Sequence, residues 1–332
     1  MAGTTACRAG YVARVSAEHL RFVYRAVPIA EEIPRTSDPT RRANLELVLA
    51  VRDFAALNGL DPGGSYLKVS ETGGRATAFV VTAAYSDRLE PYVWKYPFVG
   101  SMPYRGYFER ADADDYAATL AAQGLDTYVV DASGYSTLGW LDDPLPSGVL
   151  ALPPAGLAAF VLHELTHRRL FVSGAVDFNE TLASAVAVRL TERFFRERGD
   201  AAALAEAERR HAAWRAEAAA CDELAARLER YFAVSVGLDH GELIAGRRRI
   251  YAAAAPSLRA LGLSATPPGG AEVELNNAVL LAWYRYRRRV GDIEGFLDGY
   301  ATAADALAAL EAGLEQSDDP WLAILPAAGK KG

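Results

Sequence analysis

The order of hydrophobic and polar positions divides the chain into a helical start, a β-rich middle and a helical remainder. Helical spacing predicts two N-terminal helices, at about 8–26 and 39–58, and start and stop signals bound the second at Ser37-Asp38-Pro39 and Asn58-Gly59. Between residues 60 and 131, short stretches rich in β-branched and aromatic residues predict strands. The strands are expected at 65–70, 76–84, 92–96 and 127–131, with an irregular stretch at 97–108 and a helix at about 110–122.

From residue 156 onward, the apolar spacing is helical nearly everywhere. Helices at about 156–171 and 178–197 are separated by a short break that contains Ser173-Gly174, so we expect them to be antiparallel neighbours. Further helices are expected at about 200–236, 240–261, 272–290 and 292–314, followed by a tail at 316–332 without clear periodicity. This succession predicts an α+β protein.

Composition and charge narrow the class of protein. A chain of 332 residues with 51% hydrophobic and 23% charged residues is long enough to bury a sizeable core. The formal net charge of −7 argues against nucleic acid as a main partner, because phosphate binding needs a basic surface. No run of about eighteen apolar residues occurs, so no transmembrane helix is expected. Cys7 and Cys221 cannot form a disulfide framework or a cysteine-type zinc site, and Cys221 is expected in the core.

The strongest candidates for metal-binding and catalytic residues lie in the predicted helix at 156–171, within His163-Glu164-Leu165-Thr166-His167. Positions i and i+4 lie on the same face of a helix, so His163 and His167 could both bind one metal ion. Glu164 would lie beside the metal, where a zinc hydrolase needs a carboxylate to take a proton from metal-bound water. The motif therefore predicts a zinc hydrolase, and the alternative is two helix histidines without a metal.

The spacing leaves the third ligand open. Glu180 could supply it, but Asp177-Phe178-Asn179-Glu180 also fits a capping box, in which Glu180 would bond to the backbone at the helix start. His211 and His240 are candidates farther along the chain. Three protein ligands with an open fourth position are what a catalytic zinc site needs.

The histidine motif with the downstream Asn179-Glu180-x-x-Ala183 resembles the gluzincin metallopeptidases, whose third zinc ligand is the glutamate of such an Asn-Glu motif. The resemblance extends over most of the chain to the bacterial predicted aminopeptidases, which are often zinc-dependent lipoproteins. The other segments that carry it are Arg52-Asp53-Phe54-Ala55, Tyr104-Arg105-Gly106-Tyr107-Phe108, Tyr135-Ser136-Thr137-Leu138-Gly139-Trp140, Asp142-Asp143-Pro144-Leu145 and Asn276-Asn277-Ala278. The chain departs from the family pattern at Leu275 and at Trp283-Tyr284-Arg285-Tyr286, where one tyrosine is expected.

The resemblance implies a fold and a metal site. The fold would be α+β and zincin-like, with a small mixed sheet, an active-site helix pair and a largely helical C-terminal part. Residues 1–60 would form N-terminal helices, 61–200 the zincin-like catalytic core and 201–332 the helical part packed on it. Because no repeat or low-complexity linker separates these parts, we expect one integrated domain. The metal would be Zn²⁺, bound by His163, His167 and Glu180, with Glu164 as general base.

The resemblance also implies a donor for the oxyanion that forms during hydrolysis. Tyr286 best matches the family position, and Tyr284 and His240 are alternatives. An aromatic side chain that merely packs within a helix stripe is the simpler interpretation of Tyr286.

Substrate contacts are expected in the stretch before the metal-binding helix. By analogy with zincins, the predicted strand from Tyr135 to Leu141 would pair with the substrate backbone, which makes Tyr135, Gly139 and Trp140 candidate contacts. An aminopeptidase also needs an acidic group for the free amine of its substrate. Asp142 is the candidate, with Asp143 beside it, unless both simply form the turn before Pro144.

Cys7 lies where the relatives carry the lipid-modified cysteine of a lipoprotein signal, although only six residues precede it, without a hydrophobic stretch. A truncated start would make the protein lipid-anchored at the cell envelope or in the periplasm. A complete start would leave it cytoplasmic, with Cys7 as an ordinary exposed thiol.

Three functions are consistent with the sequence. The first is a zinc aminopeptidase that acts on peptides or proteins. The alternatives are an envelope zinc endopeptidase and a non-catalytic zinc-binding protein. Glu164 argues against the last, because a structural zinc site has no use for a base at that position.

Overall fold

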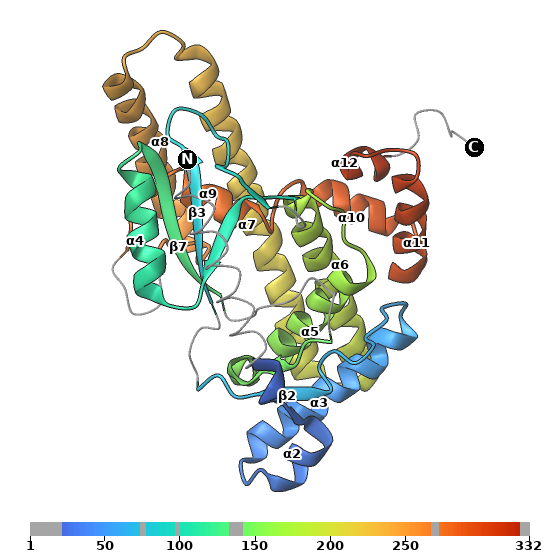
Figure 1. Cartoon of the computed structure of the whole chain (residues 1–332). Helices are drawn as coiled ribbons and strands as arrows, with labels where there is room; N and C mark the ends of the chain where they lie inside the picture. The colour runs from blue at the N-terminus through green and yellow to red at the C-terminus, as the bar shows by residue number, and fades with distance from the viewer. Residues whose placement is uncertain (1–21, 74–77, 97–99, 133–141, 267–271, 326–332) are drawn as a thin grey trace, which may run out of the picture.

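The computed structural model describes residues 22–73, 78–96, 100–132, 142–266 and 272–325. Helices form most of it, and three small sheets complete an α+β architecture (Figure 1). The predicted α+β class is therefore confirmed, whereas the zincin-like fold and the three-part division of the chain stay predictions. Among the described residues, no helix is both long and apolar enough to cross a membrane.

The N-terminal region is built around α3 (Pro39–Leu57), which confirms the helix predicted at 39–58. The Asp38 carboxylate accepts a hydrogen bond from the backbone N–H of Thr40 and thereby caps the helix start. The preceding β1 (Val27–Pro28) and α2 (Ile29–Arg35) were not predicted. The helix predicted at 8–26 lies mostly outside the described residues.

The described residues form three sheets, most of whose strands lie in the middle of the chain. The first is mixed, because β2 (Lys68–Ser70) pairs antiparallel with β1 and parallel with β8 (Leu145–Pro146). In the second, the central β3 (Ala78–Tyr85) pairs antiparallel with β6 (Tyr104–Tyr107) and β7 (Leu125–Ala132). The third pairs β4 (Trp94–Tyr96) with β5 (Gly100–Met102). The single small sheet that we expected is thus three smaller ones.

The prediction of an irregular stretch at 97–108 is wrong, because this part of the chain contains β5 and β6. Glycine and proline interrupt this stretch, so local propensity favoured a loop. The strands form because partners elsewhere in the chain complete their hydrogen bonds, for example β3 for β6. Helix α4 (Arg110–Ala121) confirms the helix predicted at 110–122 and packs on β3 and β7.

Two antiparallel helices lie at the centre of the molecule, α5 (Pro154–Arg169) and α6 (Val176–Arg198) (Figure 1). A 3₁₀ helix, η1 (Ser147–Ala151), leads into α5. Two long helices follow, α7 (Ala201–Val234) and α8 (His240–Ala260). All four α-helices agree with their predicted ranges to within two residues.

The helices after α8 differ from the predicted ones. They are α9 (Asn277–Tyr284), α10 (Val290–Asp298), α11 (Ala303–Leu314) and α12 (Pro320–Ala323). The helix expected at 272–290 begins only at α9, because Asn276 caps it by accepting from the backbone N–H of Val279. The helix expected at 292–314 is two helices, since Thr302 caps a new start by accepting from the N–H of Asp305. Helix α12 lies in the tail, where the sequence shows no clear periodicity.

The largest hydrophobic cluster joins α3, α5, α6, α10 and α11. Leu162 and Leu165 of α5 and Phe178 of α6 are fully buried in it. Each such side chain contributes about 1.5–3 kcal/mol of hydrophobic stabilisation. This packing fixes how α5 and α6 are rotated toward each other. A second cluster, under α7 and α8, contains the fully buried Cys221, as predicted, and burial raises the pKa of its thiol to about 12.

Candidate metal centre

Helix α5 presents two imidazoles on the same face. His163 and His167 are four residues apart, and their ring centroids are 4.8 Å apart. The other faces of the helix are held in the core by Leu162 and Leu165. The hydroxyl of Thr166 donates to the backbone oxygen of Leu162 at 2.8 Å, so this buried polar residue of the motif is satisfied within the helix.

The side chain of Asn179 shapes the turn between α5 and α6. Its Oδ1 accepts from the backbone N–H of Val172 at 2.9 Å, and its Nδ2 donates to the Val172 oxygen at 2.8 Å. The left-handed φ of +78° at Gly174 allows the chain to reverse within this short turn. The two hydrogen bonds hold the start of α6 to the end of α5. As a result, Glu180, the next residue, faces the histidines.

Glu180 does not cap its helix. Helix α6 begins at Val176 with Ala175 as its N-cap residue, and the cap makes no side-chain hydrogen bond. The capping-box alternative for Glu180 is therefore wrong. The carboxylate instead reaches across to His163 and His167.

Three side-chain atoms converge between the two helices. His163 Nε2 lies 3.1 Å from Glu180 Oε2 and 3.1 Å from His167 Nε2, and His167 Nε2 lies 3.3 Å from Glu180 Oε2. Around a tetrahedral zinc ion with bonds of about 2.0–2.1 Å, neighbouring donor atoms are about 3.3–3.4 Å apart. The triangle of donors thus has nearly the size of one face of a zinc coordination tetrahedron. These three residues could hold a metal ion.

The donor set is largely shielded from water. Glu180 is 8% exposed and His167 is 3% exposed. Burial by itself raises the pKa of Glu180, but the charge of His167 and hydrogen bonds from both histidines outweigh it and hold that pKa well below its usual range. Burial lowers the pKa of His167, whereas Glu180 and Glu164 raise it, and the net shift is upward. The carboxylate is therefore charged at neutral pH, as a metal ligand must be.

The second nitrogen of each imidazole has different surroundings. His163 Nδ1 lies 3.4 Å from the hydroxyl oxygen of Ser184, which is one turn beyond Glu180 on α6. Such a partner orients the ring and leaves Nε2 free for a metal. His167 Nδ1 is buried and has no hydrogen-bond partner among the described residues.

Glu164 follows the first histidine and is half-buried. No described residue forms a hydrogen bond or ion pair with its carboxylate. Its charge is close enough to contribute to the raised pKa of His167 and, after burial, to that of Tyr66. The carboxylate is thus adjacent to the donor triangle and available for proton transfer.

We call the group formed by His163, His167 and Glu180 the metal cluster. Of the three candidate oxyanion donors, Tyr286 is the one that the structure places beside it. Its ring centroid lies 6.1 Å from that of His163, and the residue is 38% exposed. The charge of Glu180, followed by burial, raises the pKa of Tyr286 well above its ordinary value. Tyr284 instead donates its hydroxyl to Asp222 at 2.7 Å, and His240 is exposed at the start of α8.

The alternative third ligand His211 is engaged elsewhere. Its Nδ1 lies 2.6 Å from Glu192 Oε1, and its Nε2 lies 2.7 Å from Glu294 Oε1. Both ring nitrogens therefore already have carboxylate partners. The structure selects Glu180, and neither His211 nor His240, as the third member of the cluster.

Asp142 has a structural partner. Its carboxylate forms an ion pair with Arg168 at 3.0 Å and accepts a hydrogen bond from the backbone N–H of Gly64. A Cβ added at Gly64 would come within 2.4 Å of the Asp142 carboxylate, so a larger residue at this position would displace that carboxylate. The neighbouring Asp143 is 3% exposed, and its backbone oxygen accepts from the N–H of Tyr66.

Tyr135, Gly139 and Trp140 fall within residues 133–141, outside the described part of the chain. Their substrate contacts, and the strand that would carry them, stay predictions.

The Asn276-Asn277 motif has a structural role. The Asn277 amide donates to the backbone oxygens of Tyr85 and Arg88 and accepts from the Tyr251 hydroxyl. Asn276 caps α9. These contacts fasten α9 to the region after β3 and do not involve the metal cluster.

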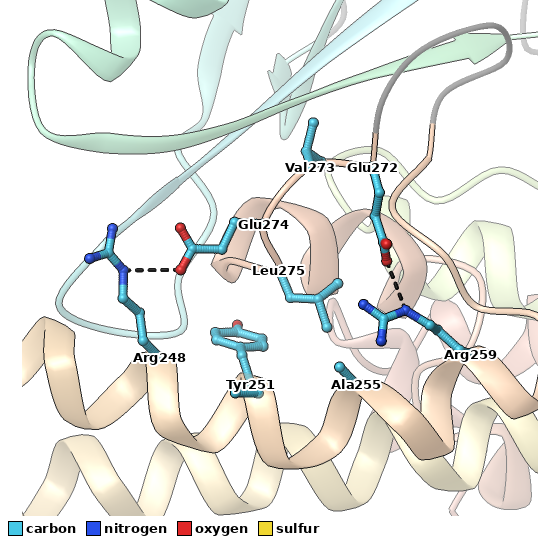
Figure 2. Close-up of a pocket in the computed structure, with 9 residues that line it drawn as sticks. Arg248, Tyr251, Ala255, Arg259, Glu272, Val273, Glu274 and Leu275 are labelled. Carbon is cyan, nitrogen blue, oxygen red and sulfur yellow. Dashed lines mark hydrogen bonds and ion pairs between the residues drawn. The ribbon is translucent and has the colours of Figure 1, made fainter.

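A pocket of about 270 Å³ lies away from the metal cluster, between α8 and residues 272–275 (Figure 2). Its two arginines are already neutralised, because Arg248 pairs with Glu274 and Arg259 with Glu272, each at 3.0 Å. None of the predicted site residues lines it. The donor triangle, not this pocket, is therefore the candidate site.

Two residues near the cluster were missed in the sequence. Tyr66 is 3% exposed, has an unusual φ of +58° and packs its ring against Phe160 of α5. No sequence pattern points to it, since a distant loop brings it to α5. Ser184 could have been found, because it lies at i+4 from Glu180 and so shares its helix face.

The comparisons with known proteins give one match. A family model described as Putative aminopeptidase matches residues 10–316, a span that includes the three donors, Glu164 and Tyr286. The comparisons with curated proteins and with solved structures found no match.

Proposed function

The chain belongs to the Putative aminopeptidase family, and on this premise we propose that it is a zinc-dependent peptidase that removes N-terminal residues from peptides. The observation that carries the proposal is the convergence of His163, His167 and Glu180, whose donor atoms all lie within 4.8 Å of one another. Glu164 is the residue next to the first of these donors. A structural metal site would not need that carboxylate.

Zinc is the metal that best fits the donor set. Two imidazole nitrogens and one carboxylate oxygen form a three-ligand set of the kind found in catalytic zinc sites. Three protein donors also leave room for water or substrate as a fourth ligand. When bound there, zinc would lower the pKa of a coordinated water toward neutrality and polarise the scissile carbonyl.

Glu164 is the proposed general base. Its carboxylate takes a proton from the attacking water and passes it to the nitrogen of the leaving amine. Two observations support this role. The side chain is half-buried, and no described residue forms a hydrogen bond or ion pair with its carboxylate. The carboxylate can therefore accept and release a proton without breaking a structural contact.

Tyr286 is the proposed donor to the oxyanion. A phenol with a pKa of about 10 or higher keeps its proton at neutral pH and can donate a hydrogen bond to developing negative charge. Support comes from the ring position, 6.1 Å from the His163 ring between centroids, and from the partial exposure of the side chain.

Tyr135, Gly139, Trp140 and Asp142 remain the proposed substrate contacts. One observation favours the endopeptidase alternative. Asp142, the proposed anchor for the free amine of the substrate, is already paired with Arg168. An endopeptidase would not need that anchor.

The experiment that tests the function compares wild type with Glu164→Gln. Metal analysis should find about one zinc per chain in both, and chelation should abolish wild-type hydrolysis. The variant should lose about 10²–10⁴-fold in kcat, the usual contribution of a general base. Glu242→Gln, an exposed change in the first turn of α8, serves as the control.

Aminoacyl-coumarin amides with a free or an acetylated amine supply the activity readout. Full activity of Glu164→Gln would refute the mechanism. Cleavage of acetylated substrates alone would remove the aminopeptidase assignment and leave a zinc endopeptidase.

A further inference from the structure

Tyr286 lies in a short turn, outside any helix. Helix α9 ends at Tyr284 and α10 begins at Val290, so Tyr286 belongs to the connection between them. Its ring lies beside that of His163, with 6.1 Å between the centroids, and the residue is 38% exposed. Because the turn carries the ring, contacts that hold the backbone of the turn also help to hold the ring beside His163.

Helix α7 bonds directly to that backbone. The indole N–H of Trp214 donates to the carbonyl oxygen of Tyr286 at 3.0 Å. Trp214 is 9% exposed and belongs to the main hydrophobic cluster, so its ring is held firmly. One turn farther along α7, the Glu217 carboxylate accepts from Arg287 Nε at 2.9 Å.

Helix α6 bonds to the turn from the other side. The hydroxyl of Thr181, the residue after Glu180, donates to the backbone oxygen of Arg285 at 3.3 Å. The carbonyls of Arg285 and Tyr286 are thus each hydrogen-bonded to a different helix. One of these two helices carries the third donor of the metal cluster.

We propose that Trp214 is a positioning residue for Tyr286: its indole hydrogen bond fixes the turn so that the phenol stays against the metal cluster. This inference rests on the proposed function, in which Tyr286 donates to the oxyanion. Displacement of a reacting group by about 1 Å can cost up to about 100-fold in rate, so a remote hydrogen bond can control kcat. Substrate binding should depend on it much less.

The test replaces Trp214 with Phe, which keeps an aromatic ring and removes the N–H donor. Trp94→Phe is the matched control, because Trp94 is similarly buried at 8% exposure and donates its indole N–H to the Tyr116 hydroxyl. With the aminoacyl-coumarin substrates, Trp214→Phe should lower kcat about 10-fold and leave KM within about two-fold. Trp94→Phe should leave both constants near wild type.

A double variant separates positioning from general structural damage. In the Tyr286→Phe background, the further change Trp214→Phe should have little effect on kcat, because the hydroxyl that it positions is already absent. A purely structural role would lower kcat by the same factor in both backgrounds and would overturn the proposal.

Crystal structures of the zinc-loaded single variants provide a readout that needs no substrate. The Tyr286 ring should leave its place beside His163 in Trp214→Phe and keep it in Trp94→Phe. An unmoved ring would overturn the proposal whatever the kinetics show. If Tyr286→Phe itself were fully active, the positioning role of Trp214 would be refuted, whereas the zinc-peptidase function would not be. If Glu164→Gln were fully active, the mechanism itself would fail.

Discussion

Two histidine–glutamate clusters share helix α6 and use the same residue types for different ends. In the metal cluster, Glu180 and the Nε2 atoms of two histidines converge within 3.1–3.3 Å. In the second cluster, one histidine, His211, lies between two carboxylates and uses both ring nitrogens. We call the second group, formed by Glu192, His211, Glu294 and Arg215, the ion-pair cluster.

Geometry, not composition, distinguishes the two clusters. In the ion-pair cluster, Arg215 Nε adds a second cation at 2.8 Å from Glu294 Oε2, so two carboxylates face two cationic side chains. Every donor there has a partner of opposite charge. In the metal cluster, the donors face one another, and a cation placed between them would satisfy all three at once. Converging donors indicate a binding site, whereas alternating charges indicate a structural clamp.

The largest predicted effect is on zinc affinity, and it separates matched substitutions of two glutamates of α6. Glu180→Ala should weaken zinc binding by more than about 100-fold, beyond the loss typical of an outer partner of a ligand, because it removes a proposed ligand. Glu192→Ala should leave zinc affinity near wild type, because among the described residues the Glu192 carboxylate bonds only to His211 of the ion-pair cluster. Competitive titration with a chromophoric chelator measures both. Equal zinc affinity in the two variants would contradict the assignment of Glu180, and not Glu192, to the metal site.

An intermediate effect is expected for His211→Gln, which removes the cation between the two carboxylates. The variant should lose about 1–3 kcal/mol of unfolding free energy, the usual consequence of leaving buried partners unsatisfied. It should keep its zinc. Urea denaturation measures the loss, and His240→Gln, an exposed histidine at the start of α8, is the control.

The loss should depend on pH in a defined direction. The hydrogen bond to Glu294 is the largest cause of the raised pKa of His211, and it outweighs burial together with Glu192. That stabilisation is complete below the unfolded value of 6.5 and disappears as pH rises through the raised pKa. Burial alone would raise the pKa of Glu294, but His211 and Arg215 outweigh burial and lower that pKa. The contribution of the Glu294 carboxylate to the unfolding free energy therefore disappears only as pH falls through the lowered pKa.

The difference between wild type and His211→Gln should therefore be largest between about pH 4.5 and 6.5, the unfolded values of the two groups, and should shrink in more alkaline solution. A difference that grew with rising pH would exclude a protonated His211 in the folded protein.

The smallest effect is expected for Ser184→Ala at the edge of the metal cluster. Ser184 is the hydroxyl partner of His163 Nδ1, and outer partners of ligands are worth about 10–100-fold in metal affinity. The long distance of 3.4 Å places this contact near the lower limit. Zinc affinity should fall about 10-fold without loss of stoichiometry. An unchanged affinity would show that packing alone orients His163.

Much of the site could be predicted because its rules are local. The spacing of His163 and His167 fixes their common face in any α-helix, and Glu164 then lies beside them. The capping and turn residues around 39–58 and 156–197 likewise act over a few residues, and those helices were confirmed. Strands β5 and β6 were missed because their hydrogen bonds depend on partners distant in the chain, and the breaks at Asn276 and Thr302 were overlooked cap signals.

Residue spacing alone left two choices open, and the family resemblance favoured Glu180 and Tyr286. Glu180 could have been a cap or a member of the metal cluster, and the bonds of Asn179 to the preceding turn decided for the cluster. Tyr284 and Tyr286 are two residues apart, and only the family resemblance favoured Tyr286 over Tyr284. In the structure, Tyr286 follows the end of α9 and lies beside His163, whereas the Tyr284 hydroxyl donates to Asp222.

The sequence by itself thus determined the α+β class, the helix pair and two adjacent histidines with a carboxylate beside them. Short-range backbone geometry is enough for those features, because an i, i+4 pair shares a face wherever the helix lies. The family resemblance favoured Glu180 as the third donor, but only the tertiary structure shows that Glu180 completes the donor triangle while His211 forms an ion-pair cluster. That decision depends on how α6, α7 and α10 pack, and packing sums contacts between residues far apart in the chain.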